Sequence, residues 1–458
     1  MFEREKRGER ALLVLPYTGK GAAVRRAREF AELAKSAGAE ILGQLRARVD
    51  APNPKFFIGT GKADEARALV RELGIDLVLV DHALTPVQER NLETHLSARV
   101  IDRAALILDI FAQRAQSHEG KLEVELAQLQ YIATRLVRGW THLERQRGGS
   151  IGLRGPGETQ LETDRRLLQK RVEQLQKRIE KVGVQRTQQR RARLRNTVPR
   201  IALVGYTNAG KSTLFNAVTR GQVFTADQLF ATLDPTVRRF DGLESGPAVL
   251  ADTVGFIREL PHDLVAAFRA TLSEARDADL LLHVIDAADP ERDALIKIVN
   301  GVLDEIGAGG VPQLKVFNKI DVLSGRASDA GNGGNARADD EGLPDRRIGE
   351  VAPRIDRDAE GAPDAVWLSA AGSAGLDLLR QAIGDRLAGS RVRAELRLPP
   401  RAGRLRARLI ELGAVRGEQY DQDGWRLDID APRELLLPLA GDVRGEDARL
   451  LRALCDRP

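Results

Sequence analysis

The sequence is poor in cysteine and aromatic residues and has no long apolar run. Its single cysteine, Cys455, excludes a disulfide framework and a cysteine-rich metal site, and it fits a reducing cytosol. No apolar run approaches the roughly 20 residues that a spanning helix needs, and the charged start from Met1 to Arg7 shows no targeting segment. We therefore expect a soluble, cytoplasmic chain without stable membrane insertion. Its 458 residues suggest two to four domains.

One stretch, Gly205–Ser212, organises the rest of the chain. It follows the apolar run Ile201–Val204 and precedes a helix-like segment. It matches G-x-x-x-x-G-K-[ST], in which glycines let backbone N–H groups surround phosphate oxygens at the positive end of a helix. The Lys211 amine would reach the β and γ phosphates, and the Ser212 hydroxyl would ligate Mg²⁺. The alternative is a strand-to-helix turn with an incidental lysine.

Three further motifs follow in the order that a GTPase needs. Asp252–Gly255 ends an apolar run, so Asp252 would lie beside the Mg²⁺ shell and the Gly255 N–H would face the γ phosphate. Asn318–Asp321 follows another apolar run, and the Asp321 carboxylate can accept from N1–H and the amine of guanine, a donor pair that adenine lacks. This selects GTP over ATP. Ser369–Ala371 supplies the last loop against the base.

A switch segment lies between the first two motifs. Phe230–Thr236 offers Thr232 to complete Mg²⁺ coordination when a γ phosphate is present. The predicted catalytic residues are Lys211, Thr232 and Gly255, and the predicted metal ligands are Ser212, Thr232 and Asp252. The predicted nucleotide-binding residues are Gly205, Tyr206, Thr207, Asn208, Ala209, Gly210, Lys211, Ser212, Thr213, Phe230, Ala231, Thr232, Leu233, Asp234, Asp252, Thr253, Val254, Gly255, Asn318, Lys319, Ile320, Asp321, Ser369, Ala370 and Ala371.

Residues 11–115 alternate apolar strands with helical patterns, which predicts a separate α/β domain. Helices are expected over 22–37 and from about 62 to 73, among strands at 11–15, 40–45, 77–80 and 99–101. Within this domain Gly59–Lys62 opens a helix. It can be interpreted as a second nucleotide site or as a solvated helix start, because a lone Gly-x-Gly-Lys is a weak signature.

From Gly120 the pattern changes to heptads in two series, which predicts an antiparallel helical hairpin. The first series is Leu122, Leu126, Leu129, Ala133, Leu136, Trp140 and Leu143, and the second is Leu161, Leu168, Val172, Leu175, Ile179 and Val182. The joint, Gly148–Gly157, is half glycine, yet it carries the apolar Ile151 and Leu153. It is either a flexible turn or a loop that presents function.

The second arm of the hairpin is strongly basic. Between Glu158 and Arg200 there are thirteen Lys or Arg and five acids, a net charge of +8, against +5 for the whole chain. Such a local excess is either a solvated face or the electrostatic footprint of nucleic-acid backbone contact. The arm has no aromatic residue, which argues against base stacking and favours a structured, phosphate-rich partner.

We therefore expect a multidomain α/β protein with an N-terminal α/β domain, an antiparallel coiled-coil hairpin, a phosphate-loop GTPase (G) domain on a mainly parallel sheet and a small C-terminal α/β appendage. The boundaries are placed at 1–115, 116–196, 197–392 and 393–458. Residues 324–351 are rich in Gly, Ala, Asp, Asn and Arg and predict a disordered insertion. The tail predicts a basic helix over 401–412 and a strand over 425–429.

The chain resembles the HflX family of translational GTPases. The resemblance rests on Asp227–Thr236, Asp252–Ile257, Pro261–Val265 and the loop Gly149–Leu161. It implies a cytoplasmic, monomeric protein that uses GTP and Mg²⁺. It also implies binding to the large ribosomal subunit and its RNA, insertion of the hairpin loop toward the peptidyl-transferase region and separation of stalled ribosomes. The alternative is a regulatory GTPase switch that acts on a protein or membrane-surface partner.

Two residues bear on how hydrolysis is switched on. In Ras-like enzymes a glutamine after the Asp-x-x-Gly glycine orients the attacking water, but this position is Phe256, so intrinsic turnover should be slow. The water-ordering group would come from the ribosome or from a monovalent cation. Asn208 resembles the phosphate-loop asparagine that holds K⁺ in related GTPases, although asparagine also serves simply to stabilise turns.

Overall fold

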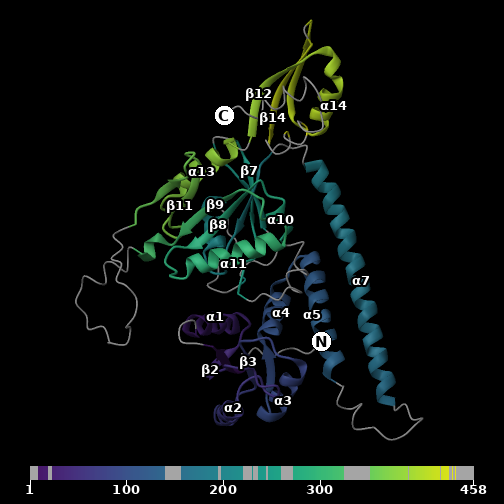
Figure 1. The fold of residues 1–458 in the computed structure, drawn as a ribbon, viewed down its shortest axis with the longest axis vertical. Helices are drawn as coiled ribbons and strands as arrows, with labels where there is room; N and C mark the ends of the chain where they lie inside the picture. The colour runs from purple at the N-terminus through teal and green to yellow at the C-terminus, as the bar shows by residue number, and fades with distance from the viewer. Residues whose placement is uncertain are drawn as a thin grey trace, which may run out of the picture. The chain divides into compact units, whose positions relative to one another are not determined.

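The structure is a computed structural model that describes residues 9–18, 23–139, 156–193, 198–219, 230, 236–243, 246–258, 272–323, 351–389, 391–422, 424–432, 436 and 439. The chain divides into two compact units. The first comprises Met1–Val182, Ala226–Asp234 and Ile257–Thr271, and the second comprises Gly183–Thr225, Pro235–Phe256 and Leu272–Pro458. Figure 1 labels many of their elements. Among the described residues, no helix is long and apolar enough to cross a bilayer.

The first unit begins with a four-stranded, wholly parallel sheet of order β2-β1-β3-β4. Helices cover both of its faces, since α2 and α3 pack on one core while α1 and α4 contact each other and the other face. β3 is therefore buried at every residue, as expected for a parallel sheet. This confirms the predicted N-terminal α/β domain. The elements are β1 (Arg10–Tyr17), α1 (Ala23–Ser36), β2 (Glu40–Arg48), α2 (Thr60–Leu73), β3 (Leu77–Val80), α3 (Pro86–Leu96), β4 (Arg99–Asp102) and α4 (Arg103–Arg114).

Local signals fix the ends of these helices. α3 begins with a capping box, in which the Thr85 side chain accepts from the Gln88 N–H and the Gln88 side chain accepts from the Thr85 N–H. α4 begins at Asp102, whose carboxylate accepts from the Ala105 N–H at 2.9 Å. α2 ends at Gly74, which has a φ of +56° in the left-handed region.

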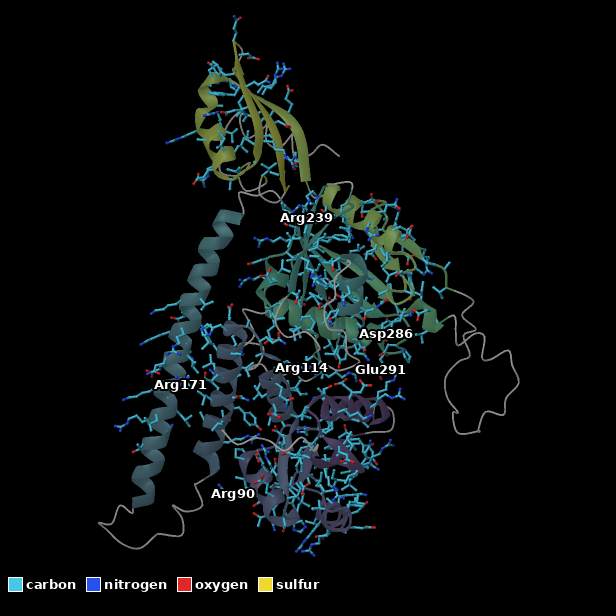
Figure 2. All side chains as sticks on the ribbon, turned by 180° about the vertical axis from the view of Figure 1, so that it is seen from behind. Arg90, Arg114, Arg171, Arg239, Asp286 and Glu291 are labelled. Atoms are coloured by element: carbon cyan, nitrogen blue, oxygen red, sulfur yellow. The ribbon has the colours of Figure 1, made fainter. Side chains whose placement is uncertain are left out.

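The two predicted hairpin helices are α5 (His118–Gly139) and α7 (Pro156–Arg193). Four heptad residues, Leu122, Leu126, Val172 and Leu175, form their buried core, with Leu129 and Ile179 partly buried beside it. An exposed ion pair joins Arg171, labelled in Figure 2, to Glu125 at 2.6 Å. Trp140, Leu143 and most of the loop Gly148–Gly157 lie outside the described residues.

The second unit contains a seven-stranded sheet of order β10-β11-β9-β8-β5-β7-β6. The five central strands are parallel, and the two edge strands, β6 and β10, run antiparallel to their neighbours. This is the mainly parallel G-domain sheet that was predicted. The strands are β5 (Arg200–Val204), β6 (Thr236–Phe240), β7 (Ala248–Asp252), β8 (Leu280–Asp286), β9 (Gln313–Asn318), β10 (Arg354–Arg357) and β11 (Pro363–Trp367).

Helices lie on both faces of this sheet. α8 (Lys211–Thr219) and α13 (Leu376–Gly389) share one apolar core with alternate residues of the strands, such as Leu203 and Leu282. The residues between them, such as Leu281, are also buried, because α10 (Ser273–Arg276) and α11 (Arg292–Glu305) pack on the other face. The predicted insertion lies outside the described residues except for its last residue, Val351.

The C-terminal appendage is a three-stranded antiparallel sheet, β12-β14-β13, packed on a helix. Its elements are β12 (Arg391–Leu398), the 3₁₀ turn η1 (Pro400–Ala402), α14 (Gly403–Glu411), β13 (Val415–Asp421) and β14 (Gly424–Pro432). The predicted helix and strand are confirmed as α14 and β14. The sequence gives no alternating pattern for β13, since this edge strand is exposed along almost its whole length.

Candidate nucleotide-binding site

The four predicted motifs follow β5, β7, β9 and β11, four of the parallel strands of the seven-stranded sheet. Carboxyl ends of parallel strands meet at one edge, where ligands bind in open α/β sheets. Hydrogen bonds join the loops there. The phosphate loop is tied to the segment after β7, because the Thr207 N–H donates to the Phe256 carbonyl at 2.8 Å and the Phe256 N–H donates to the Gly205 carbonyl at 3.1 Å.

The phosphate loop has the backbone that its glycines allow. Gly205 and Gly210 have φ of +146° and +92°, and Asn208 between them has +59°. A Cβ at Gly205 would lie 2.2 Å from the Val284 carbonyl oxygen, and one at Gly210 would lie 2.3 Å from the Asn318 amide nitrogen. Both positions therefore require glycine. The left-handed conformation of Asn208 fits its turn role, and its K⁺ role stays a prediction.

Lys211 is buried at the start of α8. Its amine donates to the carbonyls of Gly205 at 3.1 Å and Tyr206 at 2.9 Å. Burial lowers the pKa of Lys211 to about 8, against an opposing attraction to Asp252. A Cβ at Gly255 would lie 2.9 Å from this amine. Lys211 and Gly255, both predicted to be catalytic, thus lie so close together that position 255 has no room for a side chain.

The predicted metal ligands Ser212 and Asp252 lie in contact. The Ser212 hydroxyl donates to Asp252 Oδ2 at 2.7 Å, and the Asp252 side chain is fully buried. A hydroxyl and a carboxylate are oxygen ligands that suit Mg²⁺, which usually takes one or two protein ligands together with phosphate oxygens and water. The pair therefore fits Mg²⁺, which would supply charge neutralisation at the β and γ phosphates. No cluster of three or more His, Cys, Asp or Glu suited to a metal occurs among the described residues.

Asn318 connects the phosphate loop with the last loop. Its buried amide donates to the Ala209 carbonyl at 3.0 Å, and its side-chain oxygen accepts from the Ala370 N–H at 2.9 Å. Ser369 is also buried, and its hydroxyl accepts from the Gly372 N–H at 3.0 Å. Ala371 is exposed. One asparagine thus fixes the spacing of two loops that would face the nucleotide.

Lys319 connects the base-reading loop with the phosphate loop and β8. Its amine donates to the Asn208 carbonyl at 2.7 Å and to Asp286 Oδ2 at 2.9 Å. Asp286, labelled in Figure 2, was not among the predicted site residues, although it follows the apolar residues of β8 directly. Ile320 is buried, while Asp321 is exposed. The carboxylate predicted to read guanine therefore lies on an accessible surface.

The remaining predicted residues have varied positions. Thr213 lies half-buried in α8, and Val254 is buried. The buried Thr253 hydroxyl donates to the Leu203 carbonyl at 2.6 Å, so it holds two strand ends together. The Thr207 hydroxyl is buried, and no described residue gives it a hydrogen-bond partner, which suits a ligand contact. Phe230 is buried in the first unit, and Ala231, Thr232, Leu233 and Asp234 lie outside the described residues.

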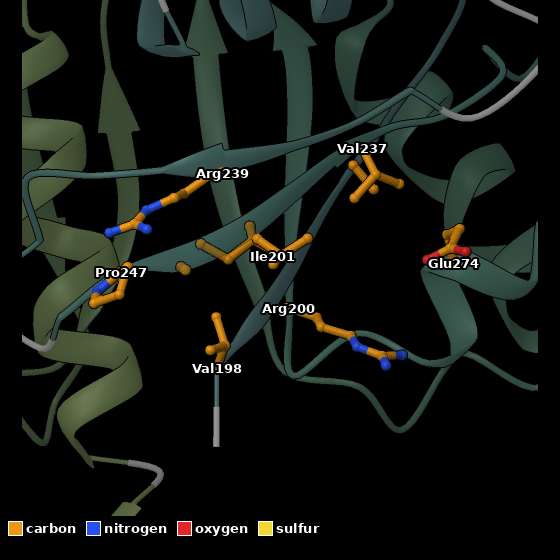
Figure 3. A pocket seen from close by; sticks show the side chains of 10 residues that line it. Val198, Arg200, Ile201, Val237, Arg239, Pro247 and Glu274 are labelled. Atoms are coloured by element: carbon orange, nitrogen blue, oxygen red, sulfur yellow. The ribbon is translucent and has the colours of Figure 1, made fainter. Parts of the chain in front are cut away.

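Two other features lie apart from this site. Gly59 precedes α2 without a side-chain cap, and the Lys62 amine pairs with Glu65 at 2.7 Å. This matches a solvated helix start, and a second nucleotide there stays a prediction. A cavity of about 410 Å³ lies beside β6, near the starts of β5 and β7 and thus away from the phosphate loop (Figure 3). Its lining includes Val198, Val237, Arg239 and Glu274.

The chain matches known proteins over almost its whole length. It is 55% identical over 424 residues to GTPase HflX of Escherichia coli (strain K12), covering 93% of each chain. It is 41% identical to GTPase HflX of Magnetococcus marinus, covering 97% of this chain and 98% of the relative. The chain belongs to the HflX family of GTPases. Like the family, it is an enzyme that hydrolyses GTP to GDP and phosphate.

Family profiles match three successive regions of the chain. Residues 25–112 match a profile described as GTP-binding GTPase N-terminal, and residues 114–193 match one described as GTP-binding GTPase Middle Region. Residues 200–319 match a profile described as 50S ribosome-binding GTPase. Among solved structures, a GTP-binding protein from Sulfolobus solfataricus in complex with GDP is 25% identical, with a TM-score of 0.42, and the match covers 82% of this chain and 98% of that chain.

Proposed function

We propose that this HflX-family GTPase binds the large ribosomal subunit through its RNA and dissociates stalled ribosomes during stress. The G domain supplies the nucleotide switch, with Ser212, Asp252 and Thr232 on Mg²⁺ and Asp321 on guanine. The hairpin loop Gly148–Gly157 reaches toward the peptidyl-transferase region. The protein acts as a monomer in the cytoplasm. Membership of the family and the profile described as 50S ribosome-binding GTPase support this proposal.

One observation on α7 supports the proposed RNA contact most directly. Arg166, Lys170, Lys177 and Lys181 are all exposed. At 100° per residue they fall within about 60° of the helix circumference, over roughly 22 Å of its length. The buried residues Val172 and Leu175 lie on the opposite side. We call these four residues the α7 cation stripe. It presents its charge outward while the other side of the helix packs on α5, as backbone contact with RNA requires.

The test is the salt dependence of large-subunit binding. Replacing the four residues of the α7 cation stripe by glutamine should weaken binding and reduce the slope of log affinity against log salt by about 3, since each lost phosphate contact removes roughly 0.7–0.9. The control carries the same charge change at exposed residues of the first unit, Arg46, Lys55, Arg71 and Arg90. An unchanged slope in the stripe variant contradicts RNA contact by α7.

The alternative is a regulatory switch that acts on a protein or a membrane surface. An apolar protein interface would give affinity that barely changes with salt, whereas RNA contact weakens steeply. Anionic vesicles added in place of ribosomal subunits separate the membrane-surface version, because they would compete for the same stripe. The basic helix alone does not distinguish these partners. The RNA interpretation is favoured by the family match and by the profile described as 50S ribosome-binding GTPase.

A further inference from the structure

We call the predicted switch Phe230–Thr236 and the stretch Asp252–Arg258, which begins with the second motif, the two switch segments. Each contributes one residue to the first unit, and both of these residues lie against α4. One is Phe230, two residues before Thr232. Its ring contacts that of Phe111 on α4 edge to face, with centroids 4.6 Å apart and planes at 78°. Phe230 is only 3% exposed, and it has a φ of +57°. A bulky residue rarely adopts this left-handed conformation, so the packing of the ring on Phe111 stabilises Phe230 in it.

The other residue is Arg258, three residues after Gly255. Its carbonyl accepts from the Arg103 guanidinium on α4 at 3.2 Å. Arg103 is almost fully buried, and it also bonds Asp81 at 2.6 Å and Glu29. Two carboxylates thus hold the guanidinium in one orientation, as a planar fork of donors allows. A shift of Arg258 therefore either breaks this hydrogen bond or moves α4.

The same segment is tied to the phosphate loop. Phe256, between Gly255 and Arg258, exchanges backbone hydrogen bonds with Gly205 and Thr207. Only Ile257 separates Phe256 from Arg258, so a displacement of Gly255 would reach the Arg103 contact along the chain.

α4 is in turn joined to the hairpin helix α5. Its N-cap, Asp102, is 1% exposed and accepts from the Tyr131 hydroxyl at 2.7 Å and from the Arg135 guanidinium at 2.7 Å, both on α5. A single carboxylate thus caps α4 and anchors α5. Breaking one partner of such a buried network leaves the others with unsatisfied groups, so α4 and α5 should move together.

We propose that α4 transmits the nucleotide state from both switch segments to the helical hairpin. Phe111 and Arg103 contact the two segments, so a movement of either segment displaces α4. Asp102, through its hydrogen bonds to Tyr131 and Arg135, then displaces α5. This extends the proposed function by naming the regulation of the hairpin. Its test needs no ribosome. This proposal can therefore fail while ribosome binding is confirmed, and ribosome binding can fail while this proposal is confirmed.

The experiment is hydrogen–deuterium exchange of the full chain with GDP and with a non-hydrolysable GTP analogue. In the unsubstituted protein we expect amide exchange in α4 and in residues 118–135 of α5 to differ between the nucleotides by about fivefold or more, the lower range of typical allosteric coupling. In the Phe111→Leu, Arg103→Lys double variant this difference should fall below twofold in both helices. GDP affinity should stay within twofold, because neither residue belongs to the nucleotide site.

Two further variants keep the test decisive. Tyr131→Phe removes one link to α5 but leaves both switch contacts, so the nucleotide difference should persist in α4 and shrink in α5. Gln113→Ala, at an exposed position of α4 whose amide bonds Ala37 and Asp109, should behave as the unsubstituted protein does. Equal exchange of α5 with both nucleotides in the unsubstituted protein would overturn the proposal. So would a difference in α5 that survives the double variant.

Discussion

Asn318→Asp tests how the nucleotide site is assembled. The change keeps the size of the side chain and the oxygen that accepts from Ala370, but it places a second oxygen 3.0 Å from the Ala209 carbonyl oxygen, where the amide had donated. Two acceptors then face each other in a side chain that is 2% exposed. An unsatisfied buried group costs about 1–3 kcal/mol. Because this free energy destabilises the loop conformation that binds nucleotide, GTP and GDP affinity should drop by roughly 10- to 100-fold.

Binding of a fluorescent GDP at pH 8 measures the effect. Burial raises the pKa of a carboxyl group, so lowering the pH should protonate the N318D side chain, restore a donor toward Ala209 and recover part of the affinity. The matched control is Asn91→Asp, which removes a similar amide hydrogen bond to the Lys55 carbonyl at 3.0 Å on an exposed part of α3. An N318D affinity within threefold of the unsubstituted protein at pH 8 would refute the assigned role of Asn318.

Three further predictions concern other parts of the G domain. Asp321→Asn should move preference from GTP toward a nucleotide whose base carries a carbonyl in place of the guanine amine; unchanged GTP affinity in competition binding would remove the basis for guanine recognition. K⁺ in place of Na⁺ should raise GTP turnover by a modest factor that Asn208→Ala abolishes, and equal rates in the two salts would eliminate the cation. Burial lowers the pKa of His283 to about 4. Since the unfolded state binds the proton first, acidification from pH 6.5 to 4 should cost roughly 3 kcal/mol of unfolding free energy. Tryptophan emission in urea measures this loss in a protein with Trp140→Phe and Trp425→Phe, which leaves Trp367 as the reporter in the G domain. His283→Gln should reduce the loss, and an equal loss with and without this change would contradict the assignment.

The chemistry of the site could be predicted from sequence because its motifs are local. Gly205 follows one apolar run and Asp252 follows another, and parallel strands bring such positions to one edge. The role of Asn318 as a connection between two loops could not be predicted, since its partners Ala209 and Ala370 contribute backbone groups that leave no pattern in the sequence.

In the first unit, too, local patterns could be predicted from sequence and long-range contacts could not. Hydrophobic periodicity predicts its strands and the hairpin core, whose buried residues are heptad positions such as Leu126 and Leu175. The packing of Phe230 on Phe111 joins residues more than a hundred positions apart. No local propensity predicts a left-handed phenylalanine, because only tertiary packing maintains that conformation.

Ribosome dissociation followed by light scattering tests the central claim most directly. The protein with GTP should separate ribosomes into subunits, whereas the protein with GDP should not. Deleting Gly149–Gly157 should abolish the separation while basal GTP hydrolysis stays nearly unchanged, because the loop is far in sequence from the phosphate-binding residues. Ribosomes should also raise GTP turnover by one to several powers of ten, about 1.4 kcal/mol of barrier for each. Equal dissociation by the deletion variant, or turnover that is fast without ribosomes, would contradict this account.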